Sequence, residues 1–586
     1  MRTVALVVGC LPLAASSASA PQEAAWDAVA GIEWDARAVE HLLNRAGFGA
    51  RPGTVERWVA RDPAALVEHL LAPPALEEPP VVPRIPLDKD RLRNLPREER
   101  RARISQIKAQ NREAVRAYAV GWVERMLAGE QPLTERMTLF WHGVFTTQAS
   151  KVKLAHELIG QNLLLREHAL GSYGRLLRAV LRDPAMLVYL DNAESEASHP
   201  NENLARELLE LFSLGEGHYG EEDVHDVARA LTGHGADRSK GYRFDPKRHD
   251  YGTKAVLGVA GPLDLDDVVD AILEHPQCAR WVAGRILTYF EGVVPAPERL
   301  ERYATLLRDA DYEIEPFLRT LFLDPDFYRP AVVGARIASP IDYLVGSARR
   351  AGIDPPAAAI LVGGTILGEQ LFEPPSVRGW EGGEAWITTA SLMDRASLAG
   401  MLLGVVGTDD LRAQDPLLEA LAREERVHPK EGADADEEGV STADVDELLG
   451  DIGEIGEMQM DALAMDYASE AMMEGDGEGR RAVATPLLRV ARVLEMTGYA
   501  PRINLVARLQ RRGAASDRAI VDVLLDELLA IEAPDATREE LVRRLRRERR
   551  KRSIEPGELL EEGERAERIL RRLAHGILSL PEAQLQ

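Results

Sequence analysis

The chain has 586 residues, 45% of them hydrophobic, so it can bury one large core or two to four ordinary ones and cannot be a peptide or wholly disordered. Its formal net charge of -25 argues against a general nucleic-acid binder, which would present a basic surface to phosphates. Two cysteines, Cys10 and Cys278, exclude a disulfide scaffold and a cysteine-based zinc module.

Residues 1–20 are typical of a secretory signal. A short charged start precedes an apolar stretch, and small residues lead to Ala20, after which we expect cleavage. The alternatives are an apolar helix packed on the body, or a lipoprotein signal modified at Cys10. An exported chain, periplasmic or extracellular, is therefore predicted, with Cys278 as a buried, inert thiol. No later apolar run approaches the roughly 20 residues that a membrane span requires.

Residues 35–425 are predicted to form a helical main domain with short turns, and the fold class is mainly α, a multi-helical globular body. An aromatic content of 5% with abundant Ala, Leu, Arg and Glu favours helix over strand. Residues 84–116 are rich in Arg and are expected to form a solvated helix face. Apolar residues three and four apart predict further helices at 117–127, 154–165, 224–231 and 268–273.

Most of the negative charge lies in one predicted insertion, residues 429–480. Its central 431–479 hold 17 Asp and Glu and no Lys, Arg or His, which indicates a flexible acidic insertion without the residue spacing of an EF-hand. Residues 481–586 are expected to be helical and to pack with the main domain. Within them, 543–552 contain eight Arg or Lys and one Glu. The acidic insertion is the expected partner of this basic stretch, and an anionic surface is the alternative.

Eight of the 13 histidines lie between His142 and His249, far more than an even spread would place there. Because histidine is the usual proton shuttle and nitrogen ligand, this enrichment points to chemistry in the region.

The central candidate is a helix predicted over residues 201–215, which ends at Gly215. At about 100° per residue, one face is apolar and the opposite face gathers Asn203, Arg206, Glu207 and Glu210. Such a stripe can coordinate a hard metal, or hold an acid and a base beside an anion-binding Arg. The alternative is an ordinary solvated face in which Arg206 pairs with Glu210.

Two further histidines have informative neighbours. His142 lies in an apolar segment, which suits a core histidine bonded to a backbone carbonyl. In the turn at 244–254, His249 and Asp250 beside Lys254 suit a ligand pair or an acid/base dyad, although loop polarity alone is the alternative explanation. No HExxH, GxSxG, P-loop or dinucleotide-binding motif occurs, which disfavours the corresponding chemistries.

These motifs, in this order, resemble the bacterial domain-of-unknown-function family numbered 1800. The similarity runs from about residue 35 to the end, apart from the acidic insertion. It lies chiefly in 41–49, 132–142, 201–215, 223–233, 249–258 and 374–380. The resemblance implies export, a largely helical fold and a companion secreted protein of the family numbered 1501, which resembles sulfatase-like or phosphatase-like enzymes. It implies no activity and no catalytic residue.

The chain departs from that family's pattern at three positions. Val144 and Phe212 stand where the family usually or often has histidine, and His234 stands where tryptophan is usual. If the missing histidines are ligands in relatives, a metal site is weakened here, unless His234 substitutes from another direction.

Two hypotheses follow. The first is an exported enzyme of envelope or extracellular polymer metabolism, with an unknown cofactor and a divalent metal as one option. Its residues would be Glu207, Glu210, Arg206 and His142 in catalysis, Asn203 and Lys254 in substrate binding, and His249 and Asp250 as metal ligands. The second is a non-catalytic scaffold, or a partner of the companion protein, that docks through the acidic insertion and the 543–552 stretch. No nucleic-acid partner is expected.

Overall fold

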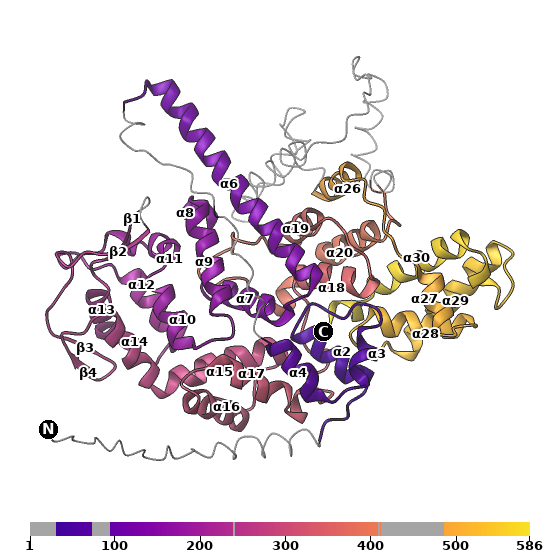
Figure 1. The fold of residues 1–586 in the computed structure, drawn as a ribbon, viewed down its shortest axis with the longest axis horizontal. Helices are drawn as coiled ribbons and strands as arrows, with labels where there is room; N and C mark the ends of the chain where they lie inside the picture. The colour runs from indigo at the N-terminus through magenta and orange to yellow at the C-terminus, as the bar shows by residue number, and fades with distance from the viewer. Residues whose placement is uncertain (1–30, 73–81, 83–93, 238–240, 408–410, 412–485) are drawn as a thin grey trace, which may run out of the picture.

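The computed structural model describes residues 31–72, 82, 94–237, 241–407, 411 and 486–586 (Figure 1). As predicted, these residues are mainly helical, with two short β-hairpins as the strands among them. The predicted signal and the acidic insertion lie outside the described residues. None of the described helices combines the length and apolar character that a membrane span requires.

The first helices lie at the centre of the molecule, and the longest crosses it diagonally in Figure 1. The Arg-rich first half of that helix, α6, is mostly exposed, while Trp122 and Met126 near its end are buried. The expected solvated face is therefore confirmed from Arg97 onward, and residues 84–93 lie outside the described residues. The helices are α2 (Ala36–Arg45), α3 (Thr54–Val59), α4 (Pro63–Leu71), α6 (Arg97–Ala128) and α7 (Pro132–Val144).

The next elements form the left side of Figure 1, where the two antiparallel hairpins cover one end. The sequence analysis did not predict these hairpins, because strands of three or four residues are too short to show a clear alternation of apolar and polar residues. The helices are α8 (Ala149–Val152), α9 (Ala155–Glu167), α10 (Tyr173–Val180), α11 (Pro184–Tyr189), η1 (Asn192–Glu194), α12 (Glu202–Glu207), the π-helix η2 (Leu208–Ser213), α13 (Glu221–Ala230) and α14 (Leu265–Glu274). The strands are β1 (His234–Asp237) paired with β2 (Gly241–Phe244), and β3 (Lys254–Val256) paired with β4 (Val259–Gly261).

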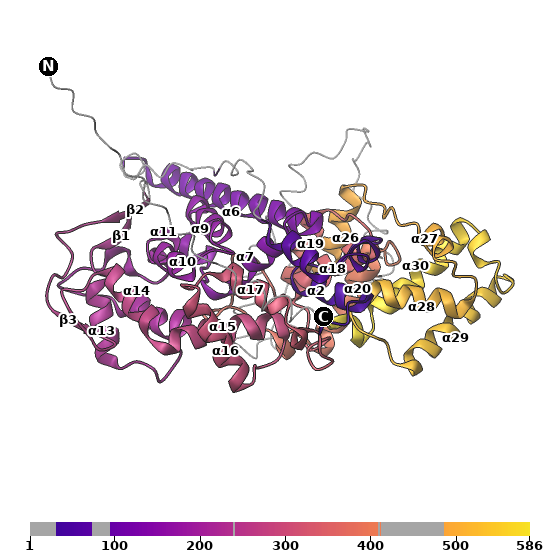
Figure 2. The same cartoon turned by 60° about the horizontal axis from the view of Figure 1, so that its bottom comes forward.

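The remaining helices complete the body and then form the opposite end, on the right of Figures 1 and 2. The body contains α15 (Pro276–Glu291), α16 (Pro297–Asp309), α17 (Ile314–Phe322), η3 (Pro325–Tyr328), α18 (Pro340–Ala351), α19 (Ala357–Ile366), η4 (Gly383–Trp386) and α20 (Thr389–Leu402). The C-terminal region contains α26 (Pro486–Met496), α27 (Leu505–Arg511), α28 (Asp517–Leu528), α29 (Asp535–Lys551), η5 (Leu559–Glu561), α30 (Glu564–Leu578) and η6 (Pro581–Gln584). In this region α26 packs on α19, α28 on α18 and α30 on α20.

The chemistry of single residues sets many helix ends. Asp35 and Ser339 cap α2 and α18, since their side-chain oxygens accept first-turn amides. Gly292 ends α15 with a φ of 74°, and a Cβ there would lie 2.7 Å from the Arg336 backbone nitrogen.

Helix α18 is buried along its whole length, although it carries charged side chains. The carboxylate of Asp342, on its first turn, forms an ion pair with Arg136 of α7 and another with Arg336 at 2.7 Å. Burial opposes ionisation of Asp342, but the two guanidinium groups outweigh it and hold the pKa of this carboxyl below its usual range. Arg136 also donates to the carbonyl of Gly47, and Arg336 to the side chain of Gln586 at 3.1 Å.

We predict that Asp342→Asn lowers the free energy of unfolding by about 3–5 kcal/mol, because it leaves the buried Arg136 and the partly buried Arg336 without their anion. Chemical denaturation of the purified protein measures this loss. Glu301→Gln is the control, since Glu301 pairs with Arg280 at 2.7 Å on the surface. Similar unfolding curves for the two variants would contradict the central role of the Asp342 ion pairs.

Candidate functional site

The predicted helix over 201–215 is present, but it changes form in the middle. Asn201 caps α12 by accepting the amide of Asn203, and from Leu208 the chain continues as a π-helix to Ser213. The Ser213 hydroxyl supports the wider turn by donating to the Leu208 carbonyl at 2.6 Å. A π-helical turn within an α-helix is rare and frequently lies at a functional site. Because the turn is wider, the regular 100° spacing used for the sequence prediction fails after Glu207.

The two central carboxylates have contrasting surroundings. Glu210 accepts from Arg378 Nη2 at 2.6 Å and from the Tyr219 hydroxyl at 3.2 Å. Glu207 is half-buried and has no hydrogen-bond or ion-pair partner within the described part of the chain. Burial and the charge of Glu210 raise the pKa of Glu207, while Arg378 and Arg206 oppose that rise. One carboxylate is therefore held by two donors, whereas its neighbour has no such donor and a raised pKa.

Residues that the sequence analysis did not select complete this group. Lys151 donates to Asp191 at 2.9 Å, and the Asn203 amide donates to the same Asp191 oxygen at 3.4 Å. Burial, with the charges of Glu373 and Glu207, raises the pKa of Tyr189 to about 12. We call this group of residues the Glu207 cluster. Its members are Lys151, Tyr189, Asp191, Asn203, Glu207, Glu210, Tyr219, Glu373 and Arg378.

Three of the seven non-glycine residues with left-handed φ angles in the described chain lie at or beside the Glu207 cluster. Asp191 and Phe372, which precedes Glu373, have left-handed φ angles of 59° and 65°, and Lys153 near Lys151 has 67°. Such angles are unfavourable for residues other than glycine, and the surrounding structure must compensate for them. Strained backbone of this kind is typical of binding and catalytic sites.

Arg206 lies on the same helix but has different partners. Its two terminal nitrogens each lie 2.9 Å from Glu221 at the start of α13, and Glu202 is 3.4 Å away. The alternative of an Arg206–Glu210 pair is therefore wrong, because Glu210 forms its ion pair with Arg378. The guanidinium of Arg206 is partly exposed and joins α12 to α13.

His142 is buried beneath the loop that carries Glu373. The ring binds a backbone N–H and not the expected carbonyl, because its Nε2 accepts from the Phe372 N–H at 3.1 Å. The ring packs near Trp122 and Trp380. Burial lowers the pKa of His142 to about 4, so the ring is neutral at pH 7 and can accept this bond. The histidine thus holds the loop of the Glu207 cluster from within the core. Gly379, farther along the same loop, lies against the Gly143 carbonyl, where a Cβ would approach to 2.5 Å.

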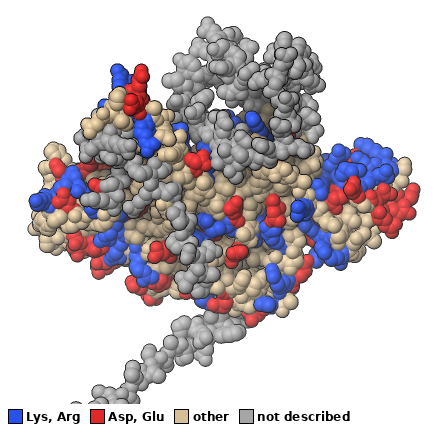
Figure 3. Space-filling view, turned by 45° about the horizontal axis from the view of Figure 1, so that its top comes forward, with Lys and Arg blue, Asp and Glu red and all other residues tan. Residues whose placement is uncertain are grey.

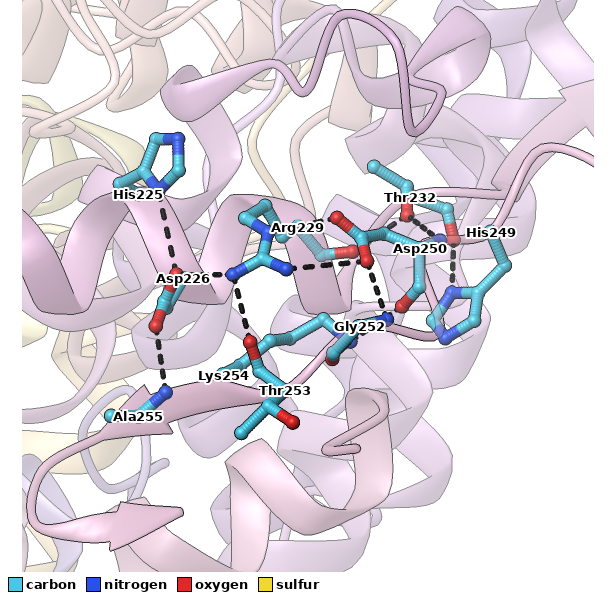
Figure 4. Close-up of polar contacts among 10 residues, drawn as sticks. All are labelled: His225, Asp226, Arg229, Thr232, His249, Asp250, Gly252, Thr253, Lys254 and Ala255. Carbon is cyan, nitrogen blue, oxygen red and sulfur yellow. Dashed lines mark hydrogen bonds and ion pairs between the residues drawn. The ribbon is translucent and has the colours of Figure 1, made fainter. Parts of the chain in front are cut away.

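The second predicted group, His249, Asp250 and Lys254, lies around the end of α13 (Figure 4). Arg229 donates to both oxygens of Asp250, at 2.8 and 3.3 Å. Lys254 is buried, and its ammonium donates to the carbonyls of Asp250 and Gly252. These contacts fix the turn, and no hydrogen bond or ion pair among the described residues joins it directly to Glu207 or Glu210.

His249 is held in one orientation because its Nδ1–H donates to the Thr232 carbonyl at 2.8 Å (Figure 4). Its ring lies 6.3 Å from that of His234, whose Nδ1 lies 2.8 Å from the Tyr242 hydroxyl. Burial, with the charges of Arg182 and His249, lowers the pKa of His234 to about 4. In the described ranges, no group of three or more His, Cys, Asp or Glu side chains has the arrangement of a metal site.

The model of the family described as "Protein of unknown function (DUF1800)" matches residues 41–585, and the chain belongs to this family. Among curated proteins and among solved structures, none matches the chain.

We predict that His142→Gln makes stability less dependent on pH. Folding lowers the pKa of His142 from 6.5 to about 4. The unfolded chain therefore binds a proton at this ring as the pH falls below 6.5, whereas the folded chain resists until about 4. This contribution to stability is complete above pH 6.5 and is lost as the pH falls toward 4, by up to about 3 kcal/mol.

Urea unfolding of both chains between pH 8 and pH 4.5 measures the difference. The substituted glutamine side chain retains an oxygen that can accept the Phe372 amide, and the exposed His199→Gln is the control. Wild-type pH dependence in His142→Gln would contradict a buried neutral ring.

Proposed function

We propose that this chain is an exported enzyme that acts on an envelope or extracellular polymer by general acid–base chemistry at the Glu207 cluster. The observation that carries the proposal is the pairing of a fixed carboxylate, Glu210, with an unpartnered one, Glu207, whose pKa is raised by burial first and then by Glu210. Neighbouring acids in contrasting surroundings are the usual arrangement for acid and base roles at neutral pH.

In this proposal Glu207 exchanges the proton with the substrate. Arg378, whose side chain is 63% exposed, holds Glu210 and presents its remaining donors to an anionic or polar group of the polymer. Lys151 and Asn203, both bound to Asp191, supply polar contacts beside it. His142 is a positioning residue, because it acts through the Phe372 amide.

A second candidate is a non-catalytic scaffold, or a partner of a secreted companion of the family numbered 1501. The basic C-terminal surface, on which α29 gathers Arg and Lys, favours this candidate, because charged surfaces steer protein association.

We predict that Glu207→Gln lowers turnover at least about a hundredfold, the usual contribution of a general acid or base. Isolated envelope polymer is incubated with the mature chain, and released fragments are quantified by mass spectrometry. Glu222→Gln is the matched control, since Glu222 is an exposed acid on α13. Equal fragment release by the wild type and Glu207→Gln would refute the role of Glu207. Absence of release by the wild type, with recovery of a stoichiometric secreted partner, would favour the scaffold.

Export has its own test. We predict that the mature chain begins at Pro21, and that Ala20→Phe retains the leader because a bulky residue blocks cleavage. Mass spectrometry of the secreted or periplasmic fraction identifies the first residue. Cys10→Ser should be processed normally, and failure of that variant to be processed would favour the lipoprotein alternative.

A further inference from the structure

The C-terminal region presents a strongly basic surface at one end of the molecule, on the right of Figure 3. Its α29 stretch over 543–552 has eight Arg or Lys and one Glu. Several of these side chains are already neutralised, because Arg543 and Arg547 both bind Glu540 and Arg549 binds Asp517. The basic composition alone therefore does not define a site.

Beside this stretch, four arginines line a partly open pocket of about 220 Å³ between the end of α29 and α30. The lining residues are Arg552, Arg565, Arg568 and Arg572, and no carboxylate belongs to the lining. Arg552 is the C-cap of α29. The other three are three and four residues apart, so they share one face of α30.

Four like charges converge on this pocket, and three of them have ion-pair partners outside its lining. Like charges three and four residues apart destabilise a helix, and a fourth cation faces them across the pocket. Arg572 is exposed and has no ion pair among the described residues. The other three each pair with one glutamate outside the lining: Arg552 with Glu548 at 2.6 Å, Arg565 with Glu562 at 3.1 Å and Arg568 with Glu564 at 3.9 Å.

We propose that this pocket binds an oxyanion of the phosphate or sulfate type, either free or as an ester group on a larger molecule. Guanidinium groups present paired N–H donors that match such oxygens bidentately. A tetrahedral oxyanion offers three or four acceptors and satisfies several arginines at once, whereas a carboxylate offers two. The site is independent of the Glu207 cluster, because none of its residues contacts that cluster.

The competing occupant is the acidic segment of the same chain, since residues 431–479 carry 17 carboxylates and no basic group. One carboxylate would satisfy fewer of the arginines than one tetrahedral oxyanion, so several acids of the segment would have to enter the pocket together. If they filled the pocket, an external oxyanion would bind only after those charges were removed.

The test is calorimetric titration of the full mature chain, in chloride buffer, with inorganic phosphate, inorganic sulfate and a short polyphosphate. We expect saturable binding of phosphate and sulfate. Arg568→Gln/Arg572→Gln should weaken it about tenfold or more, because half of the lining charge is lost. Arg511→Gln/Arg550→Gln removes the same charge from exposed positions outside the pocket and should change affinity less than about twofold. Circular dichroism confirms that both variants are folded.

The comparison of probes identifies the source of the anion. Polyphosphate binding much tighter than phosphate supports an ester or polymer ligand, whereas equal affinities support a free oxyanion. Equal weakening in the two double variants would overturn the proposal, and so would absence of saturable binding. Binding that occurs only when the 17 acids of 431–479 are replaced by Asn and Gln would overturn it as well, because the acidic segment would then be the occupant.

Discussion

The ion pairs of Asp342 are the constraint on which the rest of the body depends. Helix α18 is buried on every side, so a charged side chain on it needs oppositely charged partners held in fixed positions. Arg136 of α7 binds Asp342 and also donates to the Gly47 carbonyl. Arg336 binds Asp342 and also donates to the Gln586 side chain. Segments from the beginning, middle and end of the chain therefore meet at one carboxylate. Any packing that separates them leaves a buried charge uncompensated, so this cluster selects one arrangement of the helices.

The same helix that supplies Arg136 also connects the core to the candidate site. Six residues farther along α7, His142 accepts the Phe372 amide and so holds the loop that carries Glu373 and Arg378. The buried core thereby holds in place a loop in which Phe372 has a left-handed φ angle. The close approach of Gly379 to the α7 backbone fixes the other side of that loop. These contacts between the loop and α7, and not the α12 helix, place Arg378 against Glu210.

The sequence predicted the helices well because amphipathic spacing is a local property, and the expected helix at 224–231 corresponds to α13 (Glu221–Ala230). It predicted Glu207 and Glu210 as neighbours for the same reason. It missed the partner of Glu210, since Arg378 is 168 residues away and no local pattern joins them. It also missed the π-helical turn, which the Ser213 hydroxyl bond to the Leu208 carbonyl supports. The extension of the predicted site to His249 and Asp250 assumed a single site, whereas these residues bind Thr232 and Arg229 around another turn.

The contacts also explain why the ordered motifs identify a family without identifying a reaction. Residues 41–49 and 132–142 meet through Arg136, and Thr232 and His249 meet through a backbone carbonyl, so these motifs maintain the fold. Glu207 makes no comparable contact that holds the fold together among the described residues. A half-buried carboxylate without a hydrogen-bond or ion-pair partner among the described residues costs stability, and the charges of Arg378 and Arg206 offset that cost only in part. Glu207 makes no contact that stabilises the fold in the part of the chain that the structure describes, and it lies beside Glu210, which Arg378 holds in place. This pair of carboxylates is therefore the best candidate for a catalytic function.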